Sequence, residues 1–366
     1  MPLQGPLSVH SKNCKLFHPP PTKPWQPYGG NMKRSIIIAV ISGVLFSTGC
    51  ETGLVSDDEE QSPAYPTQQL PEDDDITGQL SPWNLIENPV YTPVHEIDYI
   101  NDHEQVFISK ACGVVLVYPH RKMIVEVVNE EAHGVLMAVT YCPITRSGIA
   151  WNRVLGSDTL LLTASGYLFR ENLMPLDVNS GSIWAQMRLQ GMSGKHNYLT
   201  VETLPLIETT WETVRDYFPE AGVFTNKLLL KSSKESDVSQ SGGIPIGQEF
   251  GILSWDAVEL FTLDMFPGEI SLQFTTVSPG GRVVVVGSTT NSYMVAFRTT
   301  YEMEAVEGEF PIVMKDETGT YWTVFGEAVN GERGGEKLES PVFYTAADWA
   351  WKKHFDNISR FYQFTE

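Results

Sequence analysis

Residues 139–153 read VTYCPITRSGIAWNR, and this stretch indicates both the fold class and the first candidate residue. A run of β-branched and aromatic residues leads into Cys142, which is typical of a buried strand. Pro143 restricts the preceding residue to an extended conformation. We therefore expect a strand that ends at Cys142 and places its thiol toward a cleft.

Similar short apolar runs recur along the chain and are separated by turn residues, which predicts a mainly β fold. They cover 113–118, 123–128, 135–141, 159–163, 166–169, 270–275, 282–286 and 293–297, with a tight turn at Pro279, Gly280 and Gly281. Two short helices are expected. Thr209 to Glu212 has the spacing of a capping box and Pro219 ends that helix, while Asp348 lies in the first turn of the second helix. The predicted class is α+β with few helices.

Two segments share residues at a constant spacing, which suggests an internal repeat. Gly181-Ser-Ile-Trp184 recurs as Gly319-Thr-Tyr-Trp322, and Trp211 recurs as Trp349, all at an offset of 138 residues. A turn that leads into a packed aromatic residue explains each residue but not the common offset. We expect a two-lobed body with a first repeat at 82–226, a linker at 227–248 and a second, degenerate repeat at 249–366.

The N-terminal region has the order of a lipoprotein signal peptide over residues 32–49. A basic start precedes an apolar run at 36–46, which is shorter than the roughly 20 residues of a membrane span. Thr48, Gly49 and Cys50 follow, so we expect Cys50 to be lipidated. Ser47 departs from the usual leucine, and an ordinary secretory signal is the alternative. Residues 1–31 are interpreted as an extension of the gene model.

Residues 50–81 are acidic, contain no Lys or Arg and predict a disordered tether. Without residues 1–49 the chain carries 20 basic and 45 acidic residues, a net charge of about −25. Such a charge argues against nucleic acid as a partner and against attraction to anionic lipid. We therefore expect membrane contact through acyl chains alone, in the bacterial cell envelope, facing the periplasm or the exterior.

The segment around Cys142 resembles a bacterial envelope family grouped as domain of unknown function 3179. Thr140, Tyr141, Cys142, Pro143 and Arg153 match its first motif. A second motif, in the same order, is matched by Ser165, Gly166, Asn172, Leu173, Asp177, Gly181, Ser182, Trp184 and Gln186. The resemblance is best over residues 97–225, and no activity comes with it.

Departures from the family pattern limit the chemistry that this segment can perform. Thr145 stands where many members have a second cysteine, which excludes a Cys-x-x-Cys redox pair or metal clip here. Asn152 replaces an aspartate. A histidine found before the cysteine in many members is lost, although Glu126 and Asn129 are kept.

Cys142 is the candidate catalytic residue, as a thiol nucleophile that would need a nearby cation or base. Arg146 and Arg153 could supply the charge, but no histidine is placed by the sequence as a base. The binding-cleft candidates are Tyr141, Arg153, Ser165, Asp177, Gln186, Glu126 and Asn129. No histidine spacing predicts a metal site, and the cofactor is unknown. Tryptophans 184, 211, 322, 349 and 351 are expected in the core rather than in a stacking platform.

We interpret the protein as a binding or assembly module for an unknown ligand or envelope protein, with a thiol-dependent envelope enzyme as the alternative. Cys142 has two possible states. It is either a free thiol, which we favour, or half of a disulfide with Cys112 if the strands at 113 and 135 are neighbours.

Overall fold

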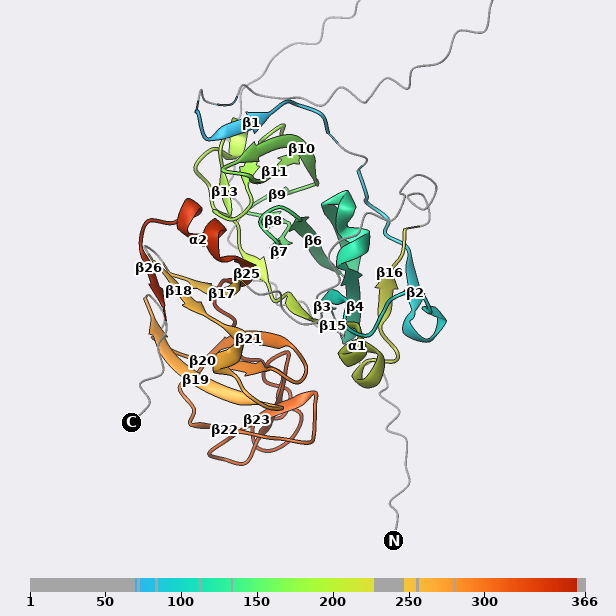
Figure 1. The fold of residues 1–366 in the computed structure, drawn as a ribbon, viewed down its shortest axis with the longest axis vertical. Helices are drawn as coiled ribbons and strands as arrows, with labels where there is room; N and C mark the ends of the chain where they lie inside the picture. The colour runs from blue at the N-terminus through green and yellow to red at the C-terminus, as the bar shows by residue number, and fades with distance from the viewer. Residues whose placement is uncertain are drawn as a thin grey trace, which may run out of the picture. The chain divides into compact units, whose positions relative to one another are not determined.

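The computed structural model describes Leu70 and residues 73–82, 85–111, 113–132, 134–226, 247–254, 257–278 and 281–360 (Figure 1). All of them belong to one compact unit that spans Pro63–Glu366. The predicted signal peptide, Cys50, most of the tether, Cys112 and most of the linker lie outside the described residues.

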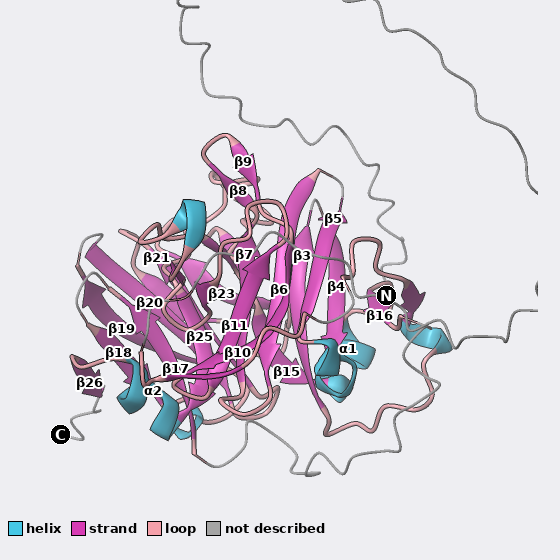
Figure 2. Ribbon diagram, turned by 90° about the horizontal axis from the view of Figure 1, so that it is seen from above, coloured by secondary structure: helices cyan, strands magenta, loops and turns pink. Residues whose placement is uncertain are grey.

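Strands dominate both halves of this unit, which confirms the mainly β fold class (Figure 2). The first half contains β1 (Ile76–Gly78), β2 (Tyr91–Pro93), β3 (Gln105–Ala111), β4 (Val114–Pro119), β5 (Val127–Ala132), β6 (Val135–Cys142), β7 (Ser147–Asn152), β8 (Val154–Leu155), β9 (Asp158–Thr159), β10 (Leu162–Phe169), β11 (Asn172–Asp177), β12 (Trp184–Ala185), β13 (Gln190–Gly191), β14 (Thr203–Leu204), β15 (Ile207–Thr210), α1 (Trp211–Tyr217) and β16 (Gly222–Phe224). Short 3-10 turns include η1 (Val94–Glu96), η2 (His120–Val125) and η3 (Gly194–His196).

The second half has its own set of strands and one α-helix. These are β17 (Gln248–Leu253), β18 (Val258–Phe261), the 3-10 turn η5 (Leu263–Met265), β19 (Ser271–Val277), β20 (Gly281–Ser288), β21 (Tyr293–Arg298), β22 (Met303–Ala305), β23 (Ile312–Asp316), β24 (Tyr321–Thr323), β25 (Phe343–Ala347), α2 (Asp348–His354) and β26 (Ile358–Arg360).

The two halves share one strand order. In the first half β15, β3, β4 and β16 lie side by side, and in the second half β25, β17, β18 and β26 do the same. In each run of four strands the last pair is parallel and the other pairs are antiparallel. The first sheet has a fifth strand, β2, which is antiparallel to β16. The meander β5-β6-β7 has its counterpart in β19-β20-β21, and each half ends in a strand, an α-helix and a strand.

The hairpins of the two meanders also match in backbone conformation. Each joins its strands through four residues, and the fourth is left-handed in both, with a φ of 53° at Arg146 and 52° at Ser292. Few non-glycine residues adopt such a φ. This agreement supports the internal repeat, which stays a prediction. The matching strand orders relate β3 to β17.

The two largest hydrophobic clusters join the two halves, whereas two smaller clusters lie within the first half. One hydrophobic cluster joins Val106 and Trp211 of the first half to Val284 and Phe297 of the second. Another joins the first meander, with Trp151, to residues of β18, β25 and α2. Each of these two clusters therefore combines the sheet that contains β3 or β17 in one half with the meander of the other.

Several expectations from the sequence are wrong in detail. Residues 123–128 do not form one strand, because the 3-10 turn η2 occupies their first part. The cap of α1 is Thr210, whose hydroxyl accepts from the Thr213 amide at 3.3 Å, one residue later than expected. Trp349 is 37% exposed although Trp211 is buried, so these two tryptophans are not equivalent.

The tryptophans at 184, 211, 322 and 351 are buried, which confirms core packing for them. The strands β4 and β6 belong to different sheets, so the neighbour relationship assumed for a Cys112–Cys142 disulfide does not exist. Among the described residues, no helix has the length and apolar character needed to cross a bilayer.

Candidate functional site: a buried polar cluster between the halves

Cys142 is a free thiol at the end of β6, as the strand prediction required. Its side chain is 2% exposed and belongs to an apolar cluster with Ile149 and Trp151. Among the described residues, its Sγ makes one hydrogen bond, to the carbonyl oxygen of Glu171 at 3.9 Å. The thiol therefore faces a core rather than the expected cleft.

Polar side chains of the two sequence motifs form a closed hydrogen-bond network beside Cys142. Asn172 Nδ2 donates to Thr145 Oγ1 at 2.8 Å and to Gln186 Oε1 at 2.7 Å. Gln186 Nε2 donates to Thr140 Oγ1 at 2.9 Å, and Ser147 Oγ donates to Gln186 Oε1 at 2.8 Å. All five side chains are fully buried. A network whose members satisfy one another stabilises a unique packing and leaves no group for a ligand.

Three other predicted site residues surround the backbone of residues 160–162. Arg153 Nε donates to the carbonyl of Leu160 at 2.6 Å, and Asp177 Oδ1 accepts from the amide of Leu161 at 2.8 Å. Asn129 Nδ2 donates to the carbonyl of Leu162 at 2.7 Å. Through these contacts the three side chains hold the backbone in place at the start of β10.

Ser165, Glu126 and Tyr141 lie in separate surroundings. The Ser165 hydroxyl accepts from the Tyr167 amide at 3.1 Å. Glu126 ends η2 in a left-handed conformation with a φ of 64°, and burial raises the pKa of its carboxyl to about 7. The structure therefore does not bring the seven predicted cleft residues together.

A different group of polar residues meets where the two halves join. Glu208 in the middle of β15 accepts from Gln248 Nε2 at 3.0 Å and from the Thr345 hydroxyl. Gln248 begins β17 and Thr345 lies in β25, so the Glu208 carboxyl links the sheet that contains β15 to the sheet that contains β17 and β25. His120, at the start of η2, places its Nε2 3.4 Å from Glu208 Oε1.

The surroundings of this pair favour its neutral forms. Burial raises the pKa of Glu208 to about 7, although Arg146 and the hydrogen bond from Thr345 oppose that shift. Burial, with the charge of Arg146, lowers the pKa of His120 to about 3. A protonated Glu208 can donate to the unprotonated Nε2 of His120, which makes the two groups a carboxylic acid–imidazole pair.

Aromatic rings close one side of the pair. The His120 ring lies between Phe107 and Tyr141, with ring centroids 4.2 Å and 4.7 Å away. Phe107 is the cross-strand partner of Glu208, and Gln105 precedes it by two residues on the same face of β3. We name Gln105, His120, Tyr141, Glu208, Gln248 and Thr345 the junction cluster. Of the cleft residues expected from the sequence, it contains Tyr141.

Residues 85–237 match the model of a family described as protein of unknown function (DUF3179). This part of the chain belongs to that family. The match confirms the resemblance seen in the sequence motifs. Neither the search of curated proteins nor the search of solved structures found a match to the chain. The DUF3179 segment contributes His120, Tyr141 and Glu208 to the junction cluster, whereas Gln248 and Thr345 come from beyond it.

Unpartnered polar atoms distinguish the junction cluster from the rest of the described chain. Nine buried side-chain nitrogen or oxygen atoms in the described residues lack a hydrogen-bond partner, and five of them belong to this cluster. These five are Gln105 Nε2, Gln105 Oε1, His120 Nε2, Glu208 Oε1 and Gln248 Oε1. His120 Nε2 and Glu208 Oε1 lie 3.4 Å apart and satisfy each other when Glu208 is protonated, which leaves the Gln105 amide and Gln248 Oε1 without a partner. Buried polar groups in folded proteins are nearly always paired, so their concentration here points to a missing partner.

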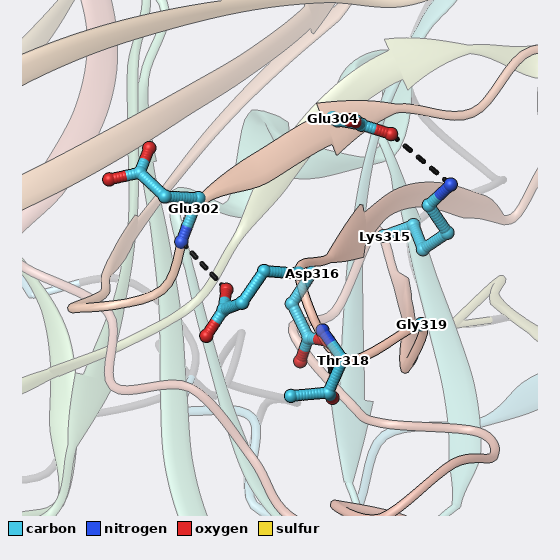
Figure 3. A pocket seen from close by; sticks show the side chains of 7 residues that line it. Glu302, Glu304, Lys315, Asp316, Thr318 and Gly319 are labelled. Atoms are coloured by element: carbon cyan, nitrogen blue, oxygen red, sulfur yellow. Dashed lines mark hydrogen bonds and ion pairs between the residues drawn. The ribbon is translucent and has the colours of Figure 1, made fainter.

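An acidic hollow on the second half is the alternative location for a ligand (Figure 3). It is lined by Glu302, Glu304, Lys315, Asp316, Glu317, Thr318 and Gly319. Its carboxylates already have partners: Glu304 pairs with Lys315 at 3.1 Å, and Glu317 accepts from the Glu302 amide at 2.9 Å. Across the described part of the chain, no group of three His, Cys, Asp or Glu residues is arranged to hold a metal ion.

Proposed function

We propose that this protein is a lipid-anchored binding module of the bacterial cell envelope that holds a small polar ligand in the junction cluster. The observation that supports this proposal is the concentration of unpartnered buried polar atoms at one place, contributed by both halves. Each unsatisfied buried group costs about 1–3 kcal/mol. A ligand that forms these hydrogen bonds would recover that energy on binding.

The surroundings of Cys142 favour a binding module over a thiol-dependent enzyme. A reactive thiolate needs a cation, a base or a helix N-terminus beside it, and it needs access for a substrate. Cys142 instead has apolar neighbours and a carbonyl oxygen, and it is almost completely buried.

A crystal structure of the protein purified from its natural host without denaturation tests the binding proposal. We expect density for an organic molecule within hydrogen-bond distance of Glu208 and Gln248. Density explained by ordered water alone would refute the proposed ligand site.

The unpartnered amide of Gln105 leads to a stability prediction for the ligand-free protein. We expect Gln105→Leu to raise the free energy of unfolding by about 1 kcal/mol, because two unsatisfied buried atoms disappear at nearly constant volume. Gln273→Leu is the matched control, since Gln273 is equally buried but donates to the Met265 carbonyl at 3.2 Å. Urea unfolding should show a higher free energy of unfolding for Gln105→Leu and a lower one for Gln273→Leu. Destabilisation by both substitutions would contradict this prediction.

Lipid anchoring predicts the form of the mature N-terminus. We expect mass spectrometry to find the mature chain starting at Cys50 with a diacylglycerol adduct, because the apolar run ends at a small-residue step before this cysteine. Cys50→Ala should move the protein from the membrane fraction to the soluble fraction. An unmodified N-terminus further along the chain would refute the anchor.

The buried thiol predicts the alkylation behaviour of Cys142. We expect iodoacetamide to leave Cys142 unlabelled in the native protein and to label it in denaturant without a reductant, because the thiol is free but only 2% exposed. Peptide mapping identifies the labelled cysteine. A requirement for reductant as well as denaturant would instead indicate a disulfide.

A further inference from the structure

Arg146 lies beside the junction cluster, and its guanidinium has no hydrogen-bond or ion-pair partner among the described residues. Its backbone carbonyl accepts from Gln248 Nε2 at 3.3 Å, which fixes its position against the second half. Its charge affects the pKa values of His120, Tyr141 and Glu208, so its guanidinium lies within electrostatic reach of all three. This side chain is half-buried, and it forms no hydrogen bond or ion pair with the rest of the described chain.

The backbone of the hairpin does not explain an arginine at this position. Ser292 occupies the matching position of the second hairpin with the same left-handed φ. A small polar residue is therefore sufficient for the turn, and the left-handed conformation is unfavourable for a long side chain. Residues held in such conformations are concentrated at functional sites.

We propose that the junction cluster binds a small organic carboxylate that also carries a hydroxyl or amino group, an inference that rests on the proposed ligand site. The carboxylate pairs with the Arg146 guanidinium, whose planar fork matches a carboxylate in a bidentate manner. The hydroxyl or amino group donates to Gln248 Oε1, which is an acceptor without a partner.

The atoms of the cluster argue against simpler ligands. An inorganic anion such as sulfate would pair with Arg146 but offers no hydrogen to Gln248 Oε1. A neutral sugar would satisfy that oxygen atom but leaves the guanidinium without an anion. The deep burial of Glu208 and Gln248, 4% and 5% exposed, restricts the donor group to a small one.

Calorimetric titration of the purified full chain with four small probes tests this inference. Glycolate and glycine carry both groups, acetate lacks the donor, and ethylene glycol lacks the carboxylate. We expect glycolate or glycine to bind at least tenfold more tightly than acetate or ethylene glycol, since a charge-assisted hydrogen bond contributes more than a factor of ten. Arg146→Gln should weaken that binding by about tenfold or more.

Arg282→Gln is the matched control for Arg146→Gln. Arg282 lies in β20 and pairs with the exposed Glu302, so its replacement should leave ligand binding unchanged. The inference is overturned if neither two-group probe binds more tightly than acetate, or if Arg146→Gln binds them as the parent does. In that case a non-carboxylate ligand in the crystal would leave the binding function intact, whereas ordered water alone would remove both proposals.

Discussion

Replacing Trp351 by alanine is expected to lower the free energy of unfolding by about 3–5 kcal/mol. The indole is fully buried, stacks on Tyr344 at a centroid distance of 4.7 Å and donates from Nε1 to the Glu249 carbonyl at 3.1 Å. It belongs to the cluster that includes Trp151 and Trp184 of the first half. Its loss should therefore destabilise both halves in one cooperative transition.

Trp349→Ala is the internal control for this prediction, since Trp349 lies on the same short helix but is 37% exposed. We expect a loss of less than about 1 kcal/mol for it. Urea unfolding followed by far-UV circular dichroism and by tryptophan fluorescence measures both variants. Two separate transitions, with only one shifted by Trp351→Ala, would show that the halves fold independently and would contradict the crossed packing.

The sequence predicts the strands around Cys142 well because local composition and turn residues determine them. The strand that ends at Cys142 and the meander at 271–298 are found nearly where the apolar runs indicate. The 3-10 turn η2 (His120–Val125) is missed because its last three residues, Met, Ile and Val, continue as an apolar run into β5 and resemble the start of a strand. Periodicity alone cannot separate such short segments.

The crossed packing could not be predicted from the sequence, since it depends on contacts between residues far apart in the chain. The offset of 138 residues relates tryptophans of the two halves, but it does not indicate which sheet packs against which meander. The one-residue shift between α1 and α2 also turned Trp349 outward and Trp351 inward. A repeat can therefore conserve strand order while individual residues change their burial.

The junction cluster was missed for the same reason. Glu208 is a single acidic residue in the strand sequence Ile-Glu-Thr-Thr, which could have signalled a buried charge. His120 follows a strand and has no motif spacing, and its contact with Glu208 joins residues 88 positions apart in the sequence. By contrast, the motif residues Thr140, Asn172 and Gln186 form a structural network. In this protein, the motif residues of that network maintain the fold, whereas the unpartnered atoms lie elsewhere.

The proton on Glu208 leads to the last prediction, a pH dependence of stability that Glu208→Gln should remove. Burial raises the pKa of Glu208 from 4.5 to about 7 in the folded protein. Between these values the folded state keeps a proton that the unfolded state has lost, so this group's contribution to stability falls as pH rises. A difference of about two to three pKa units corresponds to about 3 kcal/mol.

His120 contributes a pH dependence of stability with the opposite sign. Its pKa is lowered from 6.5 to about 3 in the folded protein. Its contribution to stability is therefore lost as the pH falls from 6.5 toward 3. Arg146 and Tyr141 also face Glu208 and are present in both variants. The parent and Glu208→Gln share all three residues, so the difference between their unfolding free energies isolates Glu208. We expect this difference to shift in favour of Glu208→Gln by about 3 kcal/mol from pH 4.5 to pH 8. A constant difference from urea titrations across that range would mean that the pKa of Glu208 is the same in the folded and unfolded protein, and the carboxylic acid–imidazole pair would then be wrong.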